Sequence, residues 1–366
     1  MLAPPWIPVP PPAYGGIESV IATLTQVLVA HGHNVTLFAP PGSRSSAAVR
    51  HPLNRPYPNE IGGVLYEVDH VARAFSALDA EAEAGLPFDV VHDHCSCAAL
   101  AMADRLATPL VHTLHGPFTG AQVGFYAAHG EKATLVAISH AQLRQAPEHL
   151  RHSPVVPNPV VVDQWPLCRE KDDFLLWIGR VTDDKGPQRA IHAARLAGRR
   201  LVMAGPVQRG QEDFFAAHVE PRINGSSVRY VGEVGGKAKA DLIARAAGLL
   251  MPIRWPEPFG MVMVEALACG TPVVAFPEGS APEIVIHGEN GFLVHDEAEM
   301  AEAVETLSEI DPDMCRATAA SRYDVEIVAE QYEAVYRECI ANKWVARAQY
   351  GAETAAVAAE HEVVAA

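Results

Sequence analysis

Two cations near the middle of the sequence could bind a charged ligand. Arg180 and Lys185 follow the apolar run FLLWIG, and Pro187 comes two residues after Lys185. Because proline is favoured in the first turn of a helix, the cations are predicted to lie between a strand and a helix N-terminus. The donor fork of arginine and the mobile charge of lysine, beside free helix amides, can bind a diphosphate. The alternative is a surface turn in which the cations pair with Asp183 and Asp184.

Two carboxylates, Glu257 and Glu265, flank a nearly apolar segment. The stretch FGMVMVEALACG predicts a buried helix that begins near Phe259 or Gly260 and ends at Gly270. Glu257 then precedes the helix, and Glu265 lies in its interior. An unpaired buried charge is costly, so Glu265 needs a partner. Two neighbouring hydroxyls of a sugar can satisfy its oxygens. The alternative partner is a buried arginine from the other half of the chain.

A pair of glycines, Gly15 and Gly16, marks a third candidate region. They stand at the start of residues 17–28, IESVIATLTQVL, whose apolar spacing predicts an amphipathic helix. Glycine lets a backbone approach a ligand closely, and the helix N-terminus adds free amides. The alternative is a tight strand-to-helix turn that binds no ligand.

The elements that hold these residues follow an alternating pattern. The first half contains short apolar runs in NVTLFAP, FDVVH, PLVHTLH and TLVAIS, each separated by enough chain for a helix or a long crossover. The second half contains six runs, FLLWIG, RLVMAG, VRYVG, GLLMPI, PVVAF and GFLV, with a helical pattern in most of the gaps. This alternation predicts an α/β protein with parallel sheets, whose second half is a complete Rossmann-like domain. Ligands of such sheets bind outside the carboxyl ends of the strands, where the candidate residues lie.

A charged stretch with prolines, VVPNPVVVDQWPLCREKDD, separates the two halves. The predicted domains are therefore residues 1–165 and 166–323, and the length of 366 residues also favours two domains. The alanine-rich residues 344–366 are predicted to be a flexible tail.

The composition is that of a globular protein, with 49% apolar and 20% charged residues. The net charge of -16 opposes non-specific binding to nucleic acid and to anionic membranes. No apolar run is long enough to span a bilayer, and the N-terminus lacks the features of a signal peptide. Six scattered cysteines without a CxxC pair favour reduced thiols. These features predict a cytoplasmic protein that holds any anionic ligand with a local cluster of cations.

Five motifs, in order along the chain, resemble those of the family 4 glycosyltransferases, retaining enzymes with the GT-B fold. The motifs are YGGIE, HTLHGPF, GRVTDDKG, PEPFGMVMVEALACGTPVVA and PEIVIHGENGFLV. The likeness runs from about residue 4 to residue 335 and includes the Glu-x7-Glu spacing of Glu257 and Glu265. The resemblance implies two Rossmann-like, doubly wound domains that face each other across a cleft. It also implies a C-terminal helix, about residues 324–343, that crosses back to the N-terminal domain.

The resemblance implies a role for each charged candidate. Arg180 and Lys185 would hold the diphosphate of a nucleotide sugar and neutralise the charge that develops as the nucleoside diphosphate leaves. Glu265 would accept the two ribose hydroxyls. Glu257 would face the donor sugar and bond one of its hydroxyls.

The same resemblance implies roles for a histidine and for several backbone amides. His115, in HTLHG, would lie in the N-terminal domain beside the reacting carbon, so His115 and Glu257 are the predicted catalytic residues. Gly15 and Gly16 would approach the phosphates from the same side. Amides that reach sugar hydroxyls or phosphate would come from Phe259, Gly260, Met261 and Val262.

No metal and no resident cofactor is predicted, because side-chain cations supply the charge and the nucleotide sugar is a co-substrate. The one Asp-x-Asp, residues 311–313, stands at a predicted helix start, where capping explains it. In HDHCSC, His92 and His94 share one face of a strand while Cys95 and Cys97 share the other. Strand-end packing is therefore favoured over a metal site.

Three further features have an ordinary explanation. Residues 189–200, RAIHAARLAGRR, predict a solvated basic helix face, because alanine dominates where a membrane helix needs bulky apolar residues. Trp165 and Trp255 could stack on a sugar or a base, or pack in the core. Ser280 follows Gly279 where the family usually has a second glycine, which predicts a less close backbone approach to the sugar.

The predicted function is retaining transfer of a sugar from a nucleotide-sugar donor, with a UDP-sugar favoured, to an acceptor that the sequence leaves open. Two alternatives remain: a nucleotide-sugar isomerase or hydrolase with the same fold, and a non-catalytic nucleotide-sugar-binding protein. A nicotinamide dehydrogenase is disfavoured, because no G-x-G-x-x-G follows a strand with an acidic residue about 20 positions later.

Overall fold

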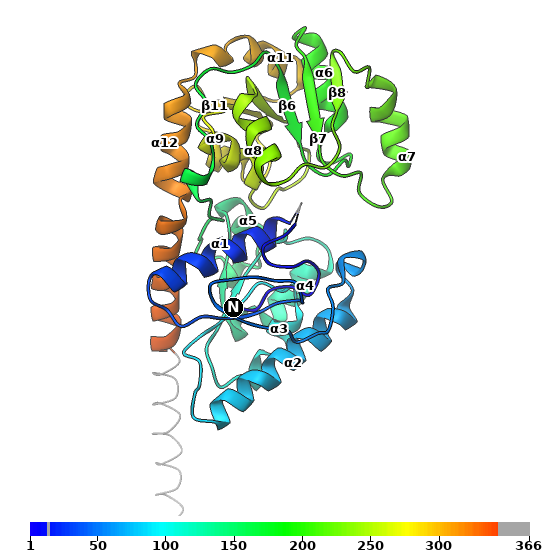
Figure 1. Ribbon diagram of the computed structural model, residues 1–366. Helices are drawn as coiled ribbons and strands as arrows, with labels where there is room; N and C mark the ends of the chain where they lie inside the picture. Colours follow the sequence, from blue (N-terminus) through cyan, green and yellow to red (C-terminus); the bar gives the residue numbers. More distant parts are fainter. Residues whose placement is uncertain (13–14, 343–366) are drawn as a thin grey trace, which may run out of the picture.

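The computed structural model describes residues 1–12 and 15–342. Two α/β halves lie one beyond the other, and helices on one side run along both (Figure 1). Each half has its own parallel sheet layers, as the alternating sequence pattern predicts.

The C-terminal half is built on a six-stranded parallel sheet of order β11-β10-β9-β6-β7-β8. Its strands are β6 (Leu175–Ile178), β7 (Leu201–Ala204), β8 (Val228–Tyr230), β9 (Gly248–Met251), β10 (Val273–Ala275) and β11 (Gly291–Leu293). All six runs predicted from the sequence form strands. The winding direction reverses between β6 and β9, which is the switch point of a Rossmann sheet and its usual ligand position.

Helices cover both faces of this sheet because neighbouring strand residues point in opposite directions. Leu176 of β6 packs with α8, α9 and α12, whereas its neighbour Trp177 packs with α6 and α11. The helices are α6 (Pro187–Leu196), α7 (Glu212–Phe214), α8 (Gly236–Arg245), α9 (Met261–Ala268), α10 (Ala281–Ile284), α11 (Glu297–Glu305) and α12 (Pro312–Tyr323).

The N-terminal half has shorter strands: β1 (Thr36–Phe38), β2 (Ala48–Arg50), β3 (Val91–Asp93), β4 (Leu110–Thr113) and β5 (Thr134–Val136). Leu2 forms single-residue bridges to Phe38 and to Asp93, so it joins the β1–β2 pair to the β3–β4–β5 sheet. The Leu2 amide donates to the carbonyl of His92 at 2.8 Å. The helices of this half are α1 (Gly16–Ala30), α2 (Val64–Glu83), α3 (Ala98–Ala101), α4 (Ala121–His129) and α5 (His140–Arg144).

Single turns complete the connections between these elements. They are the 3₁₀ turns η1 (Pro58–Glu60), η2 (Ala103–Arg105), η3 (Gly130–Lys132), η4 (Glu148–Leu150), η5 (Val162–Gln164), η7 (Glu220–Arg222) and η8 (Leu307–Glu309), and the π turn η6 (Phe215–Val219).

The chain returns to the N-terminal half after α12, as predicted. The Val160 amide donates to the Tyr323 carbonyl, and the Val325 amide donates to the Val160 carbonyl, both at 2.9 Å. The two segments that connect the halves, near residue 160 and near residue 324, are therefore hydrogen-bonded to each other. A helix over residues 325–342 then packs Val328 and Tyr332 against Leu24 and other apolar residues of α1. The predicted tail, 344–366, lies outside the described residues.

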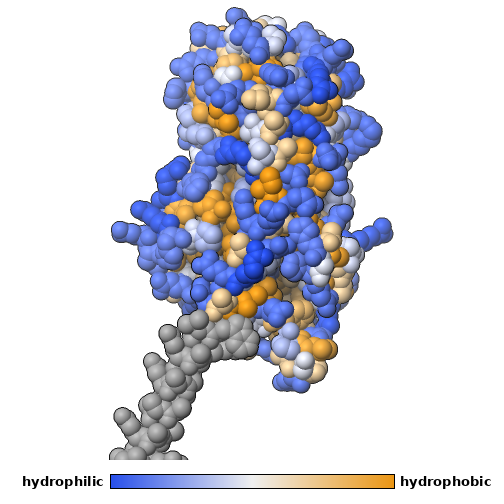
Figure 2. Space-filling model, turned by 90° about the vertical axis from the view of Figure 1, so that its left-hand side faces the viewer, coloured by the Kyte–Doolittle hydropathy of each residue, from blue (hydrophilic) through white to orange (hydrophobic). Residues whose placement is uncertain are grey.

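No helix within the described ranges is both long and apolar enough to cross a membrane. On the face shown in Figure 2, apolar side chains form small groups between hydrophilic ones. The six cysteines are all free thiols.

Candidate active site

Three loops at the carboxyl edge of the C-terminal sheet come together at the switch point. They follow β6, β9 and β10. The amide of Ser280, after β10, donates to the carbonyl of Glu257, after β9, at 3.0 Å, and its hydroxyl donates to the carbonyl of Phe259 at 2.5 Å. A Cβ on Gly279, where φ is +55°, would stand 2.3 Å from the Glu257 carbonyl oxygen. The serine thus holds the Glu257 loop, and only glycine fits before it.

Lys185 and Glu257 form an ion pair that is largely shielded from solvent. The Nζ atom of Lys185 pairs with Oε2 of Glu257, and the side chains are 14% and 11% exposed. The indole Nε1 of Trp255 donates to the same oxygen at 2.8 Å, while the lysine Nζ lies 4.5 Å from the centre of that ring. Trp255 therefore supports the pair from one side. The alternative in which Lys185 pairs with Asp183 or Asp184 is wrong.

Arg180 lies at the same edge of the sheet, and one of its nitrogens is already engaged. Its Nη1 donates to Oε1 of Gln208, in the loop after β7, at 2.6 Å. The surface-turn alternative is therefore wrong for this cation too. The remaining donors of the guanidinium fork leave capacity for an anion.

Arg189 of α6 fastens the loops that carry these cations. Its Nε donates to the carbonyl of Pro252 at 2.7 Å, and its Nη2 donates to the carbonyl of Asp183 at 2.7 Å. The side chain is only 16% exposed, so the predicted solvated basic face is wrong for Arg189. Sequence reasoning missed this role because the helical spacing of cations gave no sign of which one points inward.

Glu265 is 7% exposed and is met by Lys239 of α8. The lysine Nζ hydrogen-bonds Oε1 at 2.7 Å and lies 2.6 Å from Oε2. The ammonium group therefore lies within 2.7 Å of both carboxylate oxygens and balances the charge of the buried glutamate. Nζ also lies 5.7 Å from the centre of the Trp165 ring. The alternative of an arginine from the other half is wrong.

Sequence reasoning also missed Lys239. Its neighbours on α8, Lys237 and Asp241, pair with each other at the surface, so the local charge pattern indicates an exposed helix face. Only the packing of α8 against α9 turns Lys239 toward the glutamate.

The N-terminus of α9 presents free amides. The helix begins at Met261 after Gly260, whose φ is +81°, and a Cβ there would stand 2.5 Å from Cε of Met263. Four consecutive amides make no hydrogen bond within the described part of the chain: those of Phe259, Gly260, Met261 and Val262. Together with the helix dipole, they favour a negative group or a hydroxyl oxygen.

The two N-terminal glycines differ in their surroundings. A Cβ on Gly15 would stand 2.6 Å from Cβ of Pro11, so the turn into α1 itself requires this glycine. A Cβ on Gly16 would meet no atom of residues 1–12 or 15–342 within 4 Å. The tight-turn explanation therefore accounts for Gly15, whereas the backbone at Gly16, the first residue of α1, is open to approach.

His115 is half-buried and adjoins a pair of buried histidines, His92 and His94. Its Nε2 lies 2.9 Å from Nδ1 of His94, whose ring is 4.1 Å from that of His92. Burial lowers the pKa of His115 to about 3, so the imidazole is neutral. His92 hydrogen-bonds the hydroxyl of Tyr336, on the helix over 325–342, at 2.7 Å. His92 and His94 share one side of the strand, as predicted, and no group of three metal-ligating side chains occurs among the described residues.

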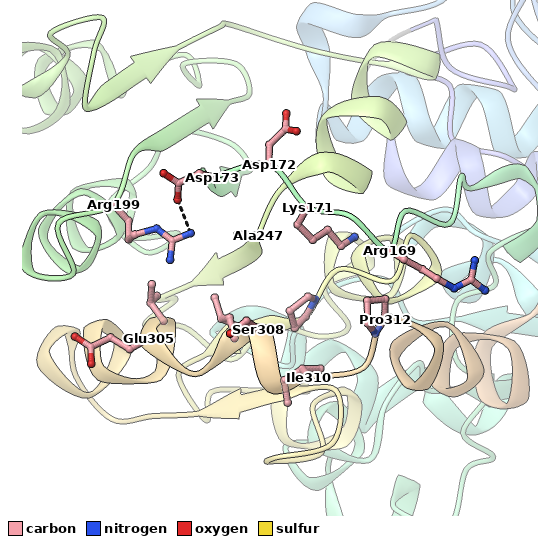
Figure 3. A pocket seen from close by; sticks show the side chains of 13 residues that line it. Arg169, Lys171, Asp172, Asp173, Arg199, Ala247, Glu305, Ser308, Ile310 and Pro312 are labelled. Atoms are coloured by element: carbon pink, nitrogen blue, oxygen red, sulfur yellow. Dashed lines mark ion pairs between the residues drawn. The ribbon is translucent and has the colours of Figure 1, made fainter.

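A hollow of about 350 Å³ lies at the opposite, amino edge of the C-terminal sheet (Figure 3). Its cations already have partners: Arg199 pairs with Asp173 at 2.8 Å, and Lys171 donates to two carbonyls and to Thr271. Burial lowers the pKa of Lys171 to about 8. This hollow is separate from the candidate site, which lies at the carboxyl ends of the strands.

A doubly wound sheet whose switch point carries cations, carboxylates and free helix amides, opposite a second α/β half, defines a nucleotide-sugar enzyme with the GT-B fold. Family models support this class along most of the chain. The model for Glycosyltransferase Family 4 matches residues 14–164, and that for Glycosyl transferases group 1 matches residues 164–323. The chain belongs to glycosyltransferase family 4, and it is an enzyme that transfers a sugar from a nucleotide-sugar donor.

Curated and solved relatives resemble this chain over most of its length. A glycogen synthase of Mycobacterium tuberculosis is 27% identical, over 89% of this chain and 92% of its own length. AviGT4, a glycosyltransferase involved in avilamycin A biosynthesis, is 27% identical with a TM-score of 0.67, over 93% of this chain and 97% of its own. HepE from Anabaena, solved in complex with UDP and glucose, shares the fold with a TM-score of 0.68 and 20% identity, over 91% and 97% of the two chains.

Proposed function

We propose that this chain is a retaining, metal-independent glycosyltransferase that uses a UDP-sugar donor in the cytoplasm. Residues 1–165 would form the acceptor-side domain and residues 166–323 the donor domain. The observation that carries the proposal is Glu265: a buried carboxylate that is paired with Lys239 and belongs to the same helix, α9, as the free amides at the helix start.

The geometry at Glu265 suits a ribose. Lys239 balances the charge of the carboxylate, and its Nζ lies within 2.7 Å of both oxygens. Each carboxylate oxygen has two lone pairs, so both can still accept from the vicinal hydroxyls of a ribose. A ligand that brings two donors therefore adds two hydrogen bonds to the contacts of the free protein.

The neighbouring groups suit the rest of a nucleotide sugar. Arg180 and Lys185 would bind the diphosphate, together with the amides at the start of α9 and the backbone at Gly16. Lys185 is paired with Glu257 in the free protein, so it would have to interact with both the diphosphate and Glu257 when the donor binds. Glu257 would then bond a hydroxyl of the donor sugar, and His115 would lie beside its reacting carbon from the other half.

The charge that develops on the departing diphosphate is balanced by fixed cations and helix amides. Such preorganised groups stabilise a leaving phosphate without a metal ion. A chelator is therefore expected to leave turnover unchanged, as measured by release of the nucleoside diphosphate from the donor. Inactivation by the chelator, reversed by a divalent ion, would overturn this part of the proposal.

UDP is favoured because HepE, which shares the fold, was solved with UDP. A thermal-shift screen of nucleoside diphosphates and nucleotide sugars tests the proposal, since a ligand that binds only the native state raises the melting temperature. Stabilisation by UDP and by one UDP-sugar is the expected result. A screen in which no nucleotide stabilises the protein would contradict the proposal.

Product analysis separates transfer from the alternatives. A hydrolase or isomerase consumes the donor at full rate in buffer that contains no acceptor, and a sensor consumes none under any condition. The transferase should release the nucleoside diphosphate rapidly only when an acceptor is present.

A further inference from the structure

A carboxylate of the C-terminal half caps a helix of the N-terminal half. Oε2 of Glu283 accepts from the amide of His140 at 2.9 Å, and Oε1 accepts from the amide of Ala141 at 2.5 Å. These are the first amides of α5, which have no partner within the helix. The contact therefore joins the two halves through charge-assisted hydrogen bonds.

The next residue of α5 extends this contact to the loop that contains His115. Gln142 is 1% exposed, and its Nε2 donates to the carbonyls of Leu114 at 2.9 Å and of Gly116 at 2.7 Å, on either side of the histidine. Its Oε1 accepts from the amide of Ile138 at 2.8 Å. Both amide hydrogens are used, so the side chain is fixed in one orientation. A shift of α5 must therefore move the backbone around His115.

The donor side of the connection is equally direct. The Ser280 amide donates to the Glu257 carbonyl at 3.0 Å, and the Glu283 amide donates to the Ser280 carbonyl at 2.8 Å. The Glu283 carbonyl accepts from the hydroxyl of Tyr323 at 3.2 Å, where the chain crosses between the halves. An unbroken series of bonds thus begins at Glu257 and ends beside His115.

From this series we propose that Glu283 and Gln142 are positioning residues that set His115 against Glu257 for sugar transfer. The inference depends on the proposed function for the roles of those two catalytic residues. Glu283 and Gln142 act through the backbone of α5 and of the loop 114–116. Since a misplacement of about 1 Å at a reacting centre can cost about a hundredfold in rate, a fixed link between the two halves has a direct effect on turnover.

Three variants separate positioning from ordinary helix capping. Glu283→Ala removes both hydrogen bonds to the amides of α5. Glu283→Gln keeps one acceptor oxygen, so it should keep one of these bonds and change exchange and turnover less than Glu283→Ala does. Arg144→Ala is the matched control. Arg144 lies 3.9 Å from Oε1 of Glu283 but is 68% exposed, so its loss removes only a weak surface ion pair.

Hydrogen exchange on the free protein tests the connection without any substrate. In Glu283→Ala, the amides of residues 114–116 should exchange about fivefold faster or more, while the melting temperature stays close to that of the wild type. Arg144→Ala should leave this exchange unchanged. Unchanged exchange at 114–116 in Glu283→Ala would overturn the proposal, because the contact would then end at α5.

A fourth variant tests the link from the side of Gln142. Gln142→Glu places an oxygen against the carbonyls of Leu114 and Gly116, so it should speed the same exchange. Combined with Glu283→Ala it should add little, because both changes break one series of bonds. Fully additive effects would contradict a single link. Should Gln142→Glu fail to fold, the Glu283 variants and the Arg144 control decide alone.

Kinetics test the consequence for transfer. With the donor that the screen identifies, Glu283→Ala should lower kcat about tenfold or more, while the Kd of UDP measured by calorimetry stays within about twofold. Equal losses in kcat and in UDP affinity, or no loss, would overturn the positioning role. If the wild type consumes no nucleotide sugar, the proposed function and this role fall together, while the exchange result still reports whether the link exists.

Discussion

Each of the two glutamates of the candidate site is met by a lysine that also lies close to an indole ring. Lys185 pairs with Glu257 beside Trp255, and Lys239 pairs with Glu265 at 5.7 Å from the ring of Trp165. A lysine over an aromatic face keeps part of its cation interaction while its charge balances the carboxylate. The paired residues are thus held in place in the free protein, and a ligand needs to reorganise little of them.

The ribose role of Glu265 predicts a specific loss of affinity. Glu265→Gln replaces a charged acceptor by a neutral amide, so the Kd of UDP should rise about tenfold or more. The Kd of 2'-deoxy-UDP should rise less, because one hydroxyl is missing already. Calorimetry with both nucleotides measures the difference.

A double variant separates this effect from a loss of fold. Glu265→Gln leaves the half-buried Lys239 without its counter-charge, so it should also lower the melting temperature. Adding Lys239→Met should restore the melting temperature but not the affinity for UDP. Equal losses for both nucleotides would contradict the ribose role.

At the scale of elements, loops after neighbouring strands position one another. The loop after β10 holds the Glu257 loop, and Arg189 of α6 holds the loops after β6 and β9. Gly279→Ala should therefore destabilise the protein by more than the about 1–2 kcal/mol that a positive φ alone costs. Its Cβ would also press on the Glu257 backbone.

Gly288→Ala is the matched control for that change. Gly288 has a φ of +82°, but a Cβ there would meet nothing within 4 Å, so only the backbone cost applies. Gly279→Ala should have the lower melting temperature of the two and should also lose turnover. Similar melting temperatures and similar activity would mean that the loop contact is not needed.

The contact between α1 and the helix over 325–342 is predicted to depend on pH. His31 bonds Glu333 at 2.6 Å and Glu326 at 2.8 Å, and the hydrogen bond to Glu333, followed by that to Glu326, raises the pKa of His31. A raised folded-state pKa gives stability that is complete below the unfolded value of 6.5 and is lost as pH rises through the folded value.

His31→Gln tests this contact. The wild type should melt above the variant at about pH 5.5, and the difference should vanish by about pH 9. A difference that is constant across this range would show that the charge on His31 contributes nothing to the docking of the helix.

At the scale of the whole molecule, burial shifts the pKa values of His70 and Glu18 in opposite directions. The two groups therefore change the free energy of unfolding with pH in opposite ways. Burial lowers the pKa of His70 to about 4, and it raises the pKa of Glu18 to about 7. His70 makes folding less favourable as pH falls below 6.5, because the unfolded chain binds the proton more tightly. Glu18 makes folding less favourable as pH rises from 4.5 to about 7.

His70→Gln should therefore flatten the acid limb of the stability curve. The Nε2 atom of His70 lies 2.9 Å from the carbonyl of Ala3, a bond that the glutamine amide can replace. Between about pH 6.5 and about pH 4 the wild type should lose about 3 kcal/mol that the variant keeps. Urea unfolding at several pH values measures the difference, and parallel curves for the two proteins would contradict the assignment.

Local pattern was enough to predict most of the fold. The six strands of the C-terminal sheet, the start of α9 beside Gly260, and the capping of α12 by Asp311 all follow from apolar period and turn chemistry within a few residues. The candidate site was only partly predictable. Both glutamates and Lys185 were predicted as site residues, but the pairing of Lys185 with Glu257 and that of Lys239 with Glu265 were not, because no periodicity relates the partners.

What the sequence determined by itself is the order of strands and helices, the family, and the residues at the carboxyl edge of the C-terminal sheet, since each depends on neighbours along the chain. Tertiary structure decided which charges meet. Lys239 and Glu265 are 26 residues apart, and Glu283 and His140 are 143 apart. Their contacts depend on how helices pack and how the two halves dock, and these angles are set by the whole core rather than by any local segment.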